Sequence, residues 1–191
     1  MSYNVGIQNK EIVWKNWKRK NGKYNKLKED VRKTFAHGTG IQILLISEFG
    51  HMFQKLSNAK EIFKELFTTM LAQLDLTRVH LEVMPPYVAL IDKTAWRVTK
   101  SELMTKLCEN NDICVHHLVV QHVDSGAFLR IFNAHIPTSV GTTKRKEACV
   151  KTLCRFATCT HSSGVAQPTP ALPWLSIVNK LLPYLGPWLV I

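Results

Sequence analysis

Polar side chains that could bind a ligand stand at the ends of three apolar segments of the chain. Asn4 interrupts a short apolar run, and Glu48 follows soon after four consecutive aliphatic residues. Asn133 and His135 close a third run. Open α/β sheets bind ligands at the carboxyl ends of their strands, so the sequence predicts candidate binding sites at these positions.

Each of these residues also has a purely structural explanation when it is taken alone. Asn4 could bond the backbone of a loop, and Glu48 could cap the segment that follows it. A histidine such as His135 is more often a core or edge residue than a catalytic one. The functional interpretation therefore depends on the set and its order, and not on one residue.

Hydrophobic periodicity predicts strands and helices that alternate along most of the chain. Leu27, Val31 and Phe35 recur every four residues, which is typical of one face of a helix. The unbroken apolar run at 41–46 predicts a strand that is buried on both faces. Strands are expected at 2–7, 41–46, 79–84, 87–91, 115–123 and 128–136, and helices at 24–35, 58–74, 99–107 and 144–154.

Capping and turn residues separate these elements. Thr99 and Glu102 have the capping-box spacing, which predicts that a short helix begins there. The segment Asp-Ser-Gly at 124–126 predicts a hairpin loop, and the two prolines at 85–86 separate two further strands. The order of elements predicts an α/β or α+β layered domain with a mixed, mostly antiparallel sheet.

The charge of the chain is strongly one-sided. The net charge is +11, and lysines and arginines crowd the first third of the sequence. A surface of one sign attracts polyanions such as nucleic acid, phosphorylated ligands or anionic lipid headgroups. A solvated basic face without a partner is the alternative.

The cysteines indicate an intracellular protein. Their number, five, is odd, and no basic-then-apolar signal segment opens the chain, which predicts free thiols in a reducing compartment, cytoplasm or nucleus. Cys149, Cys154 and Cys159 recur every five residues, a spacing that disfavours a zinc site.

Taken together, the three polar segments resemble motifs of the endonuclease/exonuclease/phosphatase superfamily. This family includes DNase I-like nucleases, abasic-site endonucleases, inositol polyphosphate phosphatases and sphingomyelinases. It opens with a strand bearing Asn, continues with an apolar strand ending in a Gln/Ser-Glu pair, and later ends a strand with Asn-x-His. The segments that match these motifs, in order, are Tyr3-Asn4-Val5, Ser47-Glu48 and Asn133-Ala134-His135.

Further segments extend this resemblance over residues 2–156. Tyr87–Asp92 followed by Trp96–Val98 is similar to the family's intervening strand pair, and Lys144-Arg145 matches the basic residues beyond the third motif. The resemblance implies a DNase I-like layered α/β sandwich over residues 1–158. The convergence of the motifs is expected at the rim of a shared β-layer.

The chemistry that the resemblance implies is hydrolysis of a phosphodiester or phosphomonoester with Mg²⁺ or Mn²⁺. Glu48 and Asn4 would form the metal side, with Asn4 holding the carboxylate in register. His135, beside Asn133, would hydrogen-bond a non-bridging phosphate oxygen in the transition state. The residues implied in substrate binding are Tyr87, Arg97, Lys144 and Arg145.

The sequence departs from the family pattern after the third motif. No Gly-Asp-x-Asn occurs, and no aspartate follows Lys144. The family uses these later motifs to position water and to supply a general acid/base pair, so we expect a hydrolase domain that is truncated and incomplete in this chain. A non-catalytic basic module that binds nucleic acid or phospholipid on the same scaffold is the alternative.

The last part of the chain changes composition. Residues 159–170 read as a linker rich in small residues and proline, and residues 171–191 form an apolar tail with aromatic residues near both ends. The tail is long enough to span a membrane, but Asn179-Lys180 near its middle disfavours a transmembrane helix. A peripheral tail in contact with a membrane surface, or a segment that arose by truncation or altered splicing, is the preferred interpretation.

Overall fold

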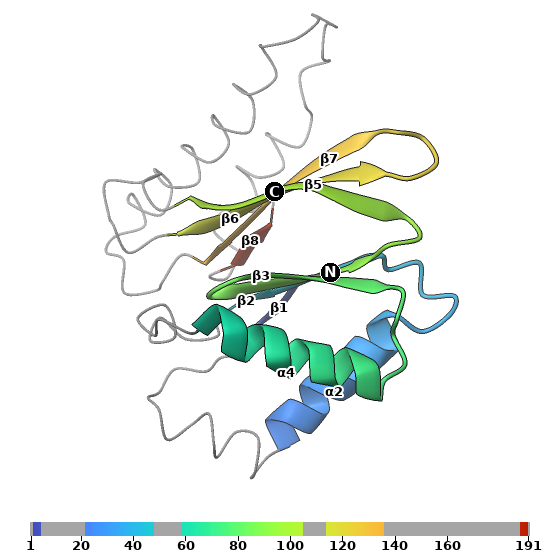
Figure 1. The fold of residues 1–191 in the computed structure, drawn as a ribbon, viewed down its shortest axis with the longest axis vertical. Coiled ribbons are helices and arrows are strands. Elements are labelled where there is room, and N and C mark those ends of the chain that lie inside the picture. Colours follow the sequence, from blue (N-terminus) through green and yellow to red (C-terminus); the bar gives the residue numbers. More distant parts are fainter. Residues whose placement is uncertain (1, 5–21, 48–58, 105–113, 136–187, 191) are drawn as a thin grey trace, which may run out of the picture. The chain divides into compact units, whose positions relative to one another are not determined.

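The computed structural model describes residues 2–4, 22–47, 59–104, 114–135 and 188–190 (Figure 1). These residues form an α+β arrangement of two helices and two four-stranded sheets. The chain divides into two compact units, Met1–Glu102 with Leu118–Leu129, and Leu103–His117 with Arg130–Ile191. The predicted α+β class is therefore confirmed.

The first sheet has the strand order β1-β2-β4-β3. Strand β1 (Ser2–Asn4) runs parallel to β2 (Ile43–Ser47), and β2 runs antiparallel to β4 (Tyr87–Asp92). Strand β3 (Val79–Met84) pairs with the other side of β4, and the two prolines form the turn between them. The sheet is therefore mixed, as predicted.

The described strands form two sheets. Both sides of β4 are occupied, by β2 and by β3, so the next strand along the chain has no edge of β4 to pair with. The chain instead begins a second sheet at β5 (Trp96–Met104). This outcome depends on which strands pair, which local sequence does not specify.

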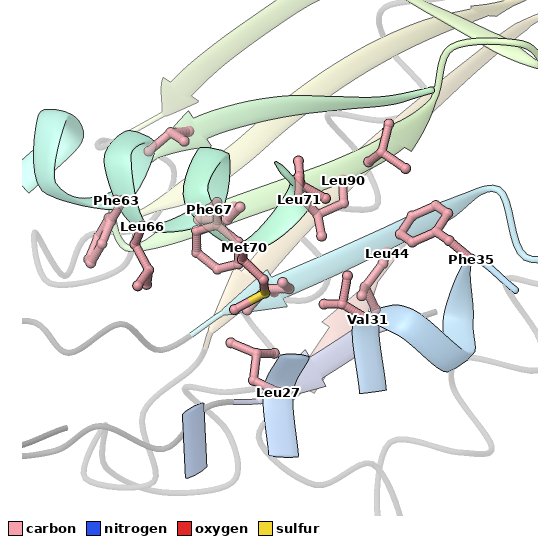
Figure 2. Close-up of a cluster of buried hydrophobic side chains, with 14 residues drawn as sticks. Leu27, Val31, Phe35, Leu44, Phe63, Leu66, Phe67, Met70, Leu71 and Leu90 are labelled. Atoms are coloured by element: carbon pink, nitrogen blue, oxygen red, sulfur yellow. The ribbon is translucent and has the colours of Figure 1, made fainter. Parts of the chain in front are cut away.

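Two helices cover one face of the first sheet (Figure 1). Helix α2 (Gly22–Thr34) and helix α4 (Ala59–Gln73) lie at the predicted positions and bury their apolar stripes there. Every residue of β4 is buried, and so are the last four residues of β2, which confirms a strand buried on both faces. Figure 2 shows the resulting core, whose fully buried members include Leu27, Val31, Phe63, Phe67, Met70 and Leu90.

Helix α4 ends in a Schellman motif. Leu76 N donates to Leu71 O at 3.0 Å, and Asp75 N donates to Ala72 O at 3.1 Å. Leu71 belongs to the core cluster and the partly buried Leu76 packs against it, which supplies the apolar contact that usually accompanies this motif. Asp75 occupies the left-handed position with φ of 53°, where glycine is normally preferred.

Replacing Asp75 with Gly is expected to raise the free energy of unfolding by about 0.5 kcal/mol. Relief of the left-handed strain exceeds the extra entropy of glycine in the unfolded chain. Urea unfolding measures the change. Asp75→Ala is the matched control, because alanine also lacks the carboxylate but keeps the strain, so the same gain with alanine would refute this explanation.

The second sheet has the strand order β5-β6-β7-β8. Strands β6 (Val115–His122) and β7 (Phe128–His135) form the predicted hairpin, with its turn at 123–127. Strand β8 (Trp188–Val190) pairs antiparallel with the end of β7. Three residues of the apolar tail are thus part of a sheet.

The helix predicted from the capping box at 99–107 is wrong over the described residues 99–104, which are in β5. Thr99 Oγ1 donates to Val119 O, at 3.1 Å, on the neighbouring strand and does not cap a helix. Glu102 pairs with Lys100 at 2.8 Å. Cross-strand pairing therefore overrides a capping signal that consists of only two residues.

Several predicted elements fall outside the described residues. These are the continuation of the first strand at 5–7, the helix at 144–154, the linker at 159–170 and most of the apolar tail. Within the described parts of the chain, neither helix has the length and apolar character needed to cross a bilayer.

Candidate functional site

The first two motifs end at the same edge of the first sheet. In the parallel pairing of β1 with β2, Ser2 lies level with Leu45, Tyr3 with Ile46, and Asn4 with Ser47. Parallel strands present their carboxyl ends at one edge, and Glu48 is the next residue after Ser47. Sequence positions more than forty residues apart are thus adjacent where the resemblance places the metal side.

Ser47 has an unusual environment for a hydroxyl. It is 1% exposed, and its Oγ has no hydrogen-bond partner among the residues that the structure describes. A buried polar atom without a partner costs about 1–3 kcal/mol and calls for an explanation, such as a water or ligand nearby. Glu48 itself lies outside the described residues.

A second buried polar group lies in the third motif. Asn133 is 2% exposed, and within the described parts of the chain its Nδ2 also lacks a hydrogen-bond partner. On the backbone, Asn133 pairs with Val190 and His135 with Trp188. The two motif residues are therefore on β7, at the end that β8 covers.

The motifs do not lie on one β-layer, so this expectation is wrong. Asn4 is on β1 of the first sheet, whereas Asn133 and His135 are on β7 of the second. Strands β5, β6, β7 and β8 pair with one another and not with an edge strand of the first sheet. Asn4 pairs with Ser47 on the neighbouring strand, whereas Asn133 and His135 are two residues apart on the same strand.

The residues implied in substrate contact have different environments. Tyr87 is 1% exposed and belongs to the interior of the first sheet, whereas Arg97 is exposed on β5. Lys144 and Arg145 lie outside the described residues. Arg97 is therefore the member of this set that the described structure leaves open to a ligand.

Two adjacent histidines on β6 are buried, and the sequence pattern did not predict a role for them. His116 is 0% and His117 3% exposed, and the His117 ring stacks on Phe132 with centroids 4.7 Å apart and planes 2° apart. Neighbouring strand residues point to opposite faces, so their joint burial means that both faces of the sheet are covered at the start of β6, away from the hairpin turn. Their only sequence signal was an apolar strand pattern that includes two polar residues.

The basic residues of α2 are partly paired within the helix. Glu29 accepts a hydrogen bond from Arg32 at 2.6 Å and lies 3.6 Å from Lys33. The hydrogen bond from Arg32, supported by the two positive charges, lowers the pKa of Glu29 to about 2, and the same pair raises the pKa of Arg32. Lys28 donates to Gln73 on α4 at 2.8 Å.

The described residues contain no cluster of three or more His, Cys, Asp or Glu side chains that could hold a metal. No family model matches the chain, and a search of the curated proteins finds no match either. The register of the strands and the chemistry of the residues are therefore the features that indicate the class of the site.

Proposed function

We propose that the chain carries part of a phosphoester-hydrolase site of the endonuclease/exonuclease/phosphatase type, dependent on Mg²⁺ or Mn²⁺ and incomplete in this chain. The observation that carries the proposal is the parallel register of β1 and β2, with Asn4 level with Ser47. Two short motifs that are weak on their own thus end side by side at a strand edge where sheets of this kind bind ligands.

The residues at this edge suit a hard cation. Mg²⁺ prefers oxygen ligands and retains several waters, so one carboxylate, that of Glu48, is enough to anchor it. The amide of Asn4 would hold that carboxylate in register. The bound ion would neutralise charge on the phosphate and on its leaving oxygen.

The resemblance assigns the phosphate contacts to Asn133 and His135. An amide Nδ2 only donates, and that of Asn133 is buried without a partner among the described residues, so it could donate to an anionic oxygen. His135 would hydrogen-bond a non-bridging oxygen of the phosphate. The DNase I-like fold that the resemblance implies belongs to this same proposal.

Hydrolysis by this chain is expected to be weak. The sequence lacks Gly-Asp-x-Asn and an aspartate next to a late histidine, so no residue is assigned to activate water. We expect binding of Mn²⁺ as a spectroscopic substitute for Mg²⁺, and little cleavage of DNA, RNA or smaller phosphoesters.

The proposal is tested by metal titration of the full chain and by cleavage assays with Mg²⁺ against EDTA. Calorimetric titration with Mn²⁺ and labelled nucleic acid substrates give independent measurements. Saturable Mn²⁺ binding is the expected result. A chain that binds no metal and shows no difference between Mg²⁺ and EDTA would rule out the site.

A second candidate function is polyanion binding without catalysis, and the exposed basic side of α2 favours it. Lys26, Arg32 and Lys33 are all exposed on this helix, in a chain with a net charge of +11. Clustered cations attract phosphates and release their counterions, which makes binding strongly dependent on salt.

Replacing Glu29 with Gln is expected to tighten polyanion binding. The change frees Arg32 and Lys33 from their shared carboxylate and raises the net charge by one. Each cation that gains a phosphate contact should steepen the slope of log K against log salt by about 0.9. Heparin and duplex DNA titrations at several salt concentrations measure it, and an unchanged slope would place the binding surface elsewhere.

The same substitution should alter the pH dependence of stability in acid. With its pKa lowered from 4.5 to about 2, Glu29 contributes stability above pH 4.5, and this contribution disappears as the pH falls through about 2. The Glu29 side chain is 43% exposed and solvent screens the pair, so the effect is expected to be small. In a plot of the free energy of unfolding against pH, Glu29→Gln should therefore reduce the fall below pH 4.5 only slightly.

A further inference from the structure

Two backbone hydrogen bonds set the register of β5, β6 and the start of β7. Val123 N donates to Ala95 O at 2.8 Å. His122 N donates to Ala127 O, also at 2.8 Å. Both bonds join antiparallel neighbours, so residues on adjacent strands can be matched by counting from each bond.

Arg97, Gln121 and Phe128 lie in one row across these strands. Val123 lies opposite Ala95, so two residues further along each strand Gln121 lies opposite Arg97. His122 lies opposite Ala127, so one residue further along Gln121 lies opposite Phe128. The rings of Trp96 and His122, in the adjacent row, meet edge to face with centroids 4.9 Å apart, which agrees with this register. All five residues belong to the first compact unit.

This row lies on a face of the sheet that solvent can reach. Phe128 is 65% exposed and Arg97 is exposed, whereas on the opposite face Leu118 and Val120 are both 0% exposed. Val123, two residues from Gln121 and hence on the same face, is 50% exposed. We call Arg97, Gln121, Val123 and Phe128 the Phe128 face.

The Phe128 face combines an exposed aromatic ring with an exposed arginine. Phe128 offers an open aromatic ring that is 65% exposed, although burying such a side chain is favourable. Arg97 forms no ion pair with any residue that the structure describes. Two strand spacings separate Arg97 from Phe128, about 10 Å, so one ligand can reach both.

Single-stranded nucleic acid fits this combination. An unpaired base can stack on an aromatic ring, and the neighbouring phosphates can pair with an arginine at the side. A duplex keeps the faces of its bases stacked inside the helix and cannot offer one to Phe128. The net charge of +11 complements the phosphate backbone.

We infer that the Phe128 face binds single-stranded DNA or RNA, with a base stacked on Phe128 and a phosphate paired with Arg97. This inference rests on the proposed polyanion binding and names its ligand class. It does not depend on the metal site, because none of the four residues of this face belongs to a metal motif.

The test measures binding of a labelled oligo-dT of about 12 nucleotides, within the usual site size for single-strand binding surfaces, by fluorescence anisotropy in EDTA. Phe128→Ala is expected to weaken binding about 5- to 100-fold, as the loss of one stacked base requires. Phe128→Tyr should retain the affinity. Arg97→Ala should weaken binding and reduce the salt slope by about 1.

Leu129→Ala is the matched control. Leu129 is also exposed, at 41%, but it follows Phe128 on the strand and points to the opposite face. We expect its oligo-dT affinity to equal that of the wild type, with unchanged circular dichroism for all variants. Equal losses for Phe128→Ala and Leu129→Ala would overturn the stacking role.

The outcomes separate this inference from the broader proposal. Equal affinity for duplex and oligo-dT, with Phe128→Ala unchanged, would overturn the inference and leave polyanion binding in place. Failure to bind heparin, duplex or oligo-dT would overturn both. A loss on Phe128→Ala that is seen with phosphatidylserine vesicles but not with oligo-dT would overturn the inference in favour of a lipid surface.

One acidic residue near this face provides an additional test. Asp124 is exposed in the hairpin turn and opposes the approach of phosphates. Asp124→Asn is therefore expected to tighten oligo-dT binding, most visibly at low salt where screening is weak. Weaker binding of this variant would contradict a phosphate-bearing ligand on the Phe128 face.

Discussion

Replacing Glu48 with Gln is expected to weaken Mn²⁺ binding by at least about tenfold and to abolish any Mg²⁺-dependent cleavage. Loss of outer-shell partners alone typically costs 10- to 100-fold in metal affinity, and Glu48 is the proposed carboxylate ligand itself. Glutamine keeps the size and one oxygen but removes the charge that a hard cation requires. Calorimetric titration measures the affinity without relying on turnover.

Salt-sensitive binding of DNA in EDTA should be nearly unchanged in this variant, because it depends on cations elsewhere in the chain. Glu65→Gln is the matched control: it makes the same chemical change at an exposed position of α4. The proposed site would be refuted if both variants lost metal affinity equally. Loss of DNA binding with intact cleavage would also contradict it.

Replacing Phe67 with Ala is expected to lower the free energy of unfolding by about 3–5 kcal/mol. Phe67 is 0% exposed in the core between α4 and the first sheet (Figure 2), and truncation removes its transfer energy and leaves a cavity. Domains are usually stable by only 5–15 kcal/mol, so this is a large fraction of the total. Urea unfolding measures the midpoint.

The neighbouring position provides the control for helix propensity. Thr68 is exposed on the same helix, and Thr68→Ala should change stability by no more than about 0.5 kcal/mol. Alanine favours a helix, so any loss in Phe67→Ala comes from packing. A loss below 1 kcal/mol, with an unchanged m value, would mean that the core around α4 is not closed as described.

A related prediction concerns the buried hydroxyl of Ser47 at the end of the second motif. Ser47→Ala is expected to leave the free energy of unfolding unchanged or slightly higher, because Ser47 Oγ has no partner among the described residues. Removing a buried hydroxyl that is unsatisfied relieves its desolvation cost. A marked destabilisation in urea would mean that Ser47 has a structural partner after all.

Much of the local structure was determined by the sequence itself. The four-residue spacing of Leu27, Val31 and Phe35 predicted α2, and the unbroken run at 41–46 predicted a strand buried on both faces. The hairpin between β6 and β7 followed from the turn at 124–126. These elements depend on neighbours along the chain, and periodicity reports such neighbours directly.

The prediction of a helix at Thr99 was wrong because the structure there depends on a segment that is distant along the chain. Two residues with capping-box spacing carry little energy, and Thr99 instead bonds the backbone of β6 at Val119. Which strand lies beside β5 is a long-range choice that local spacing does not contain. The hydrogen bond across the sheet decided the secondary structure.

Tertiary structure alone decided how the candidate site residues are placed. The types of Asn4, Glu48, Asn133 and His135 could be read from the sequence, and so could their positions near strand ends. That Asn4 lies level with Ser47, and that β7 belongs to a second sheet, follows from strand pairing. Pairing is set by cross-strand contacts between distant segments, whereas the sequence pattern records only which faces are apolar.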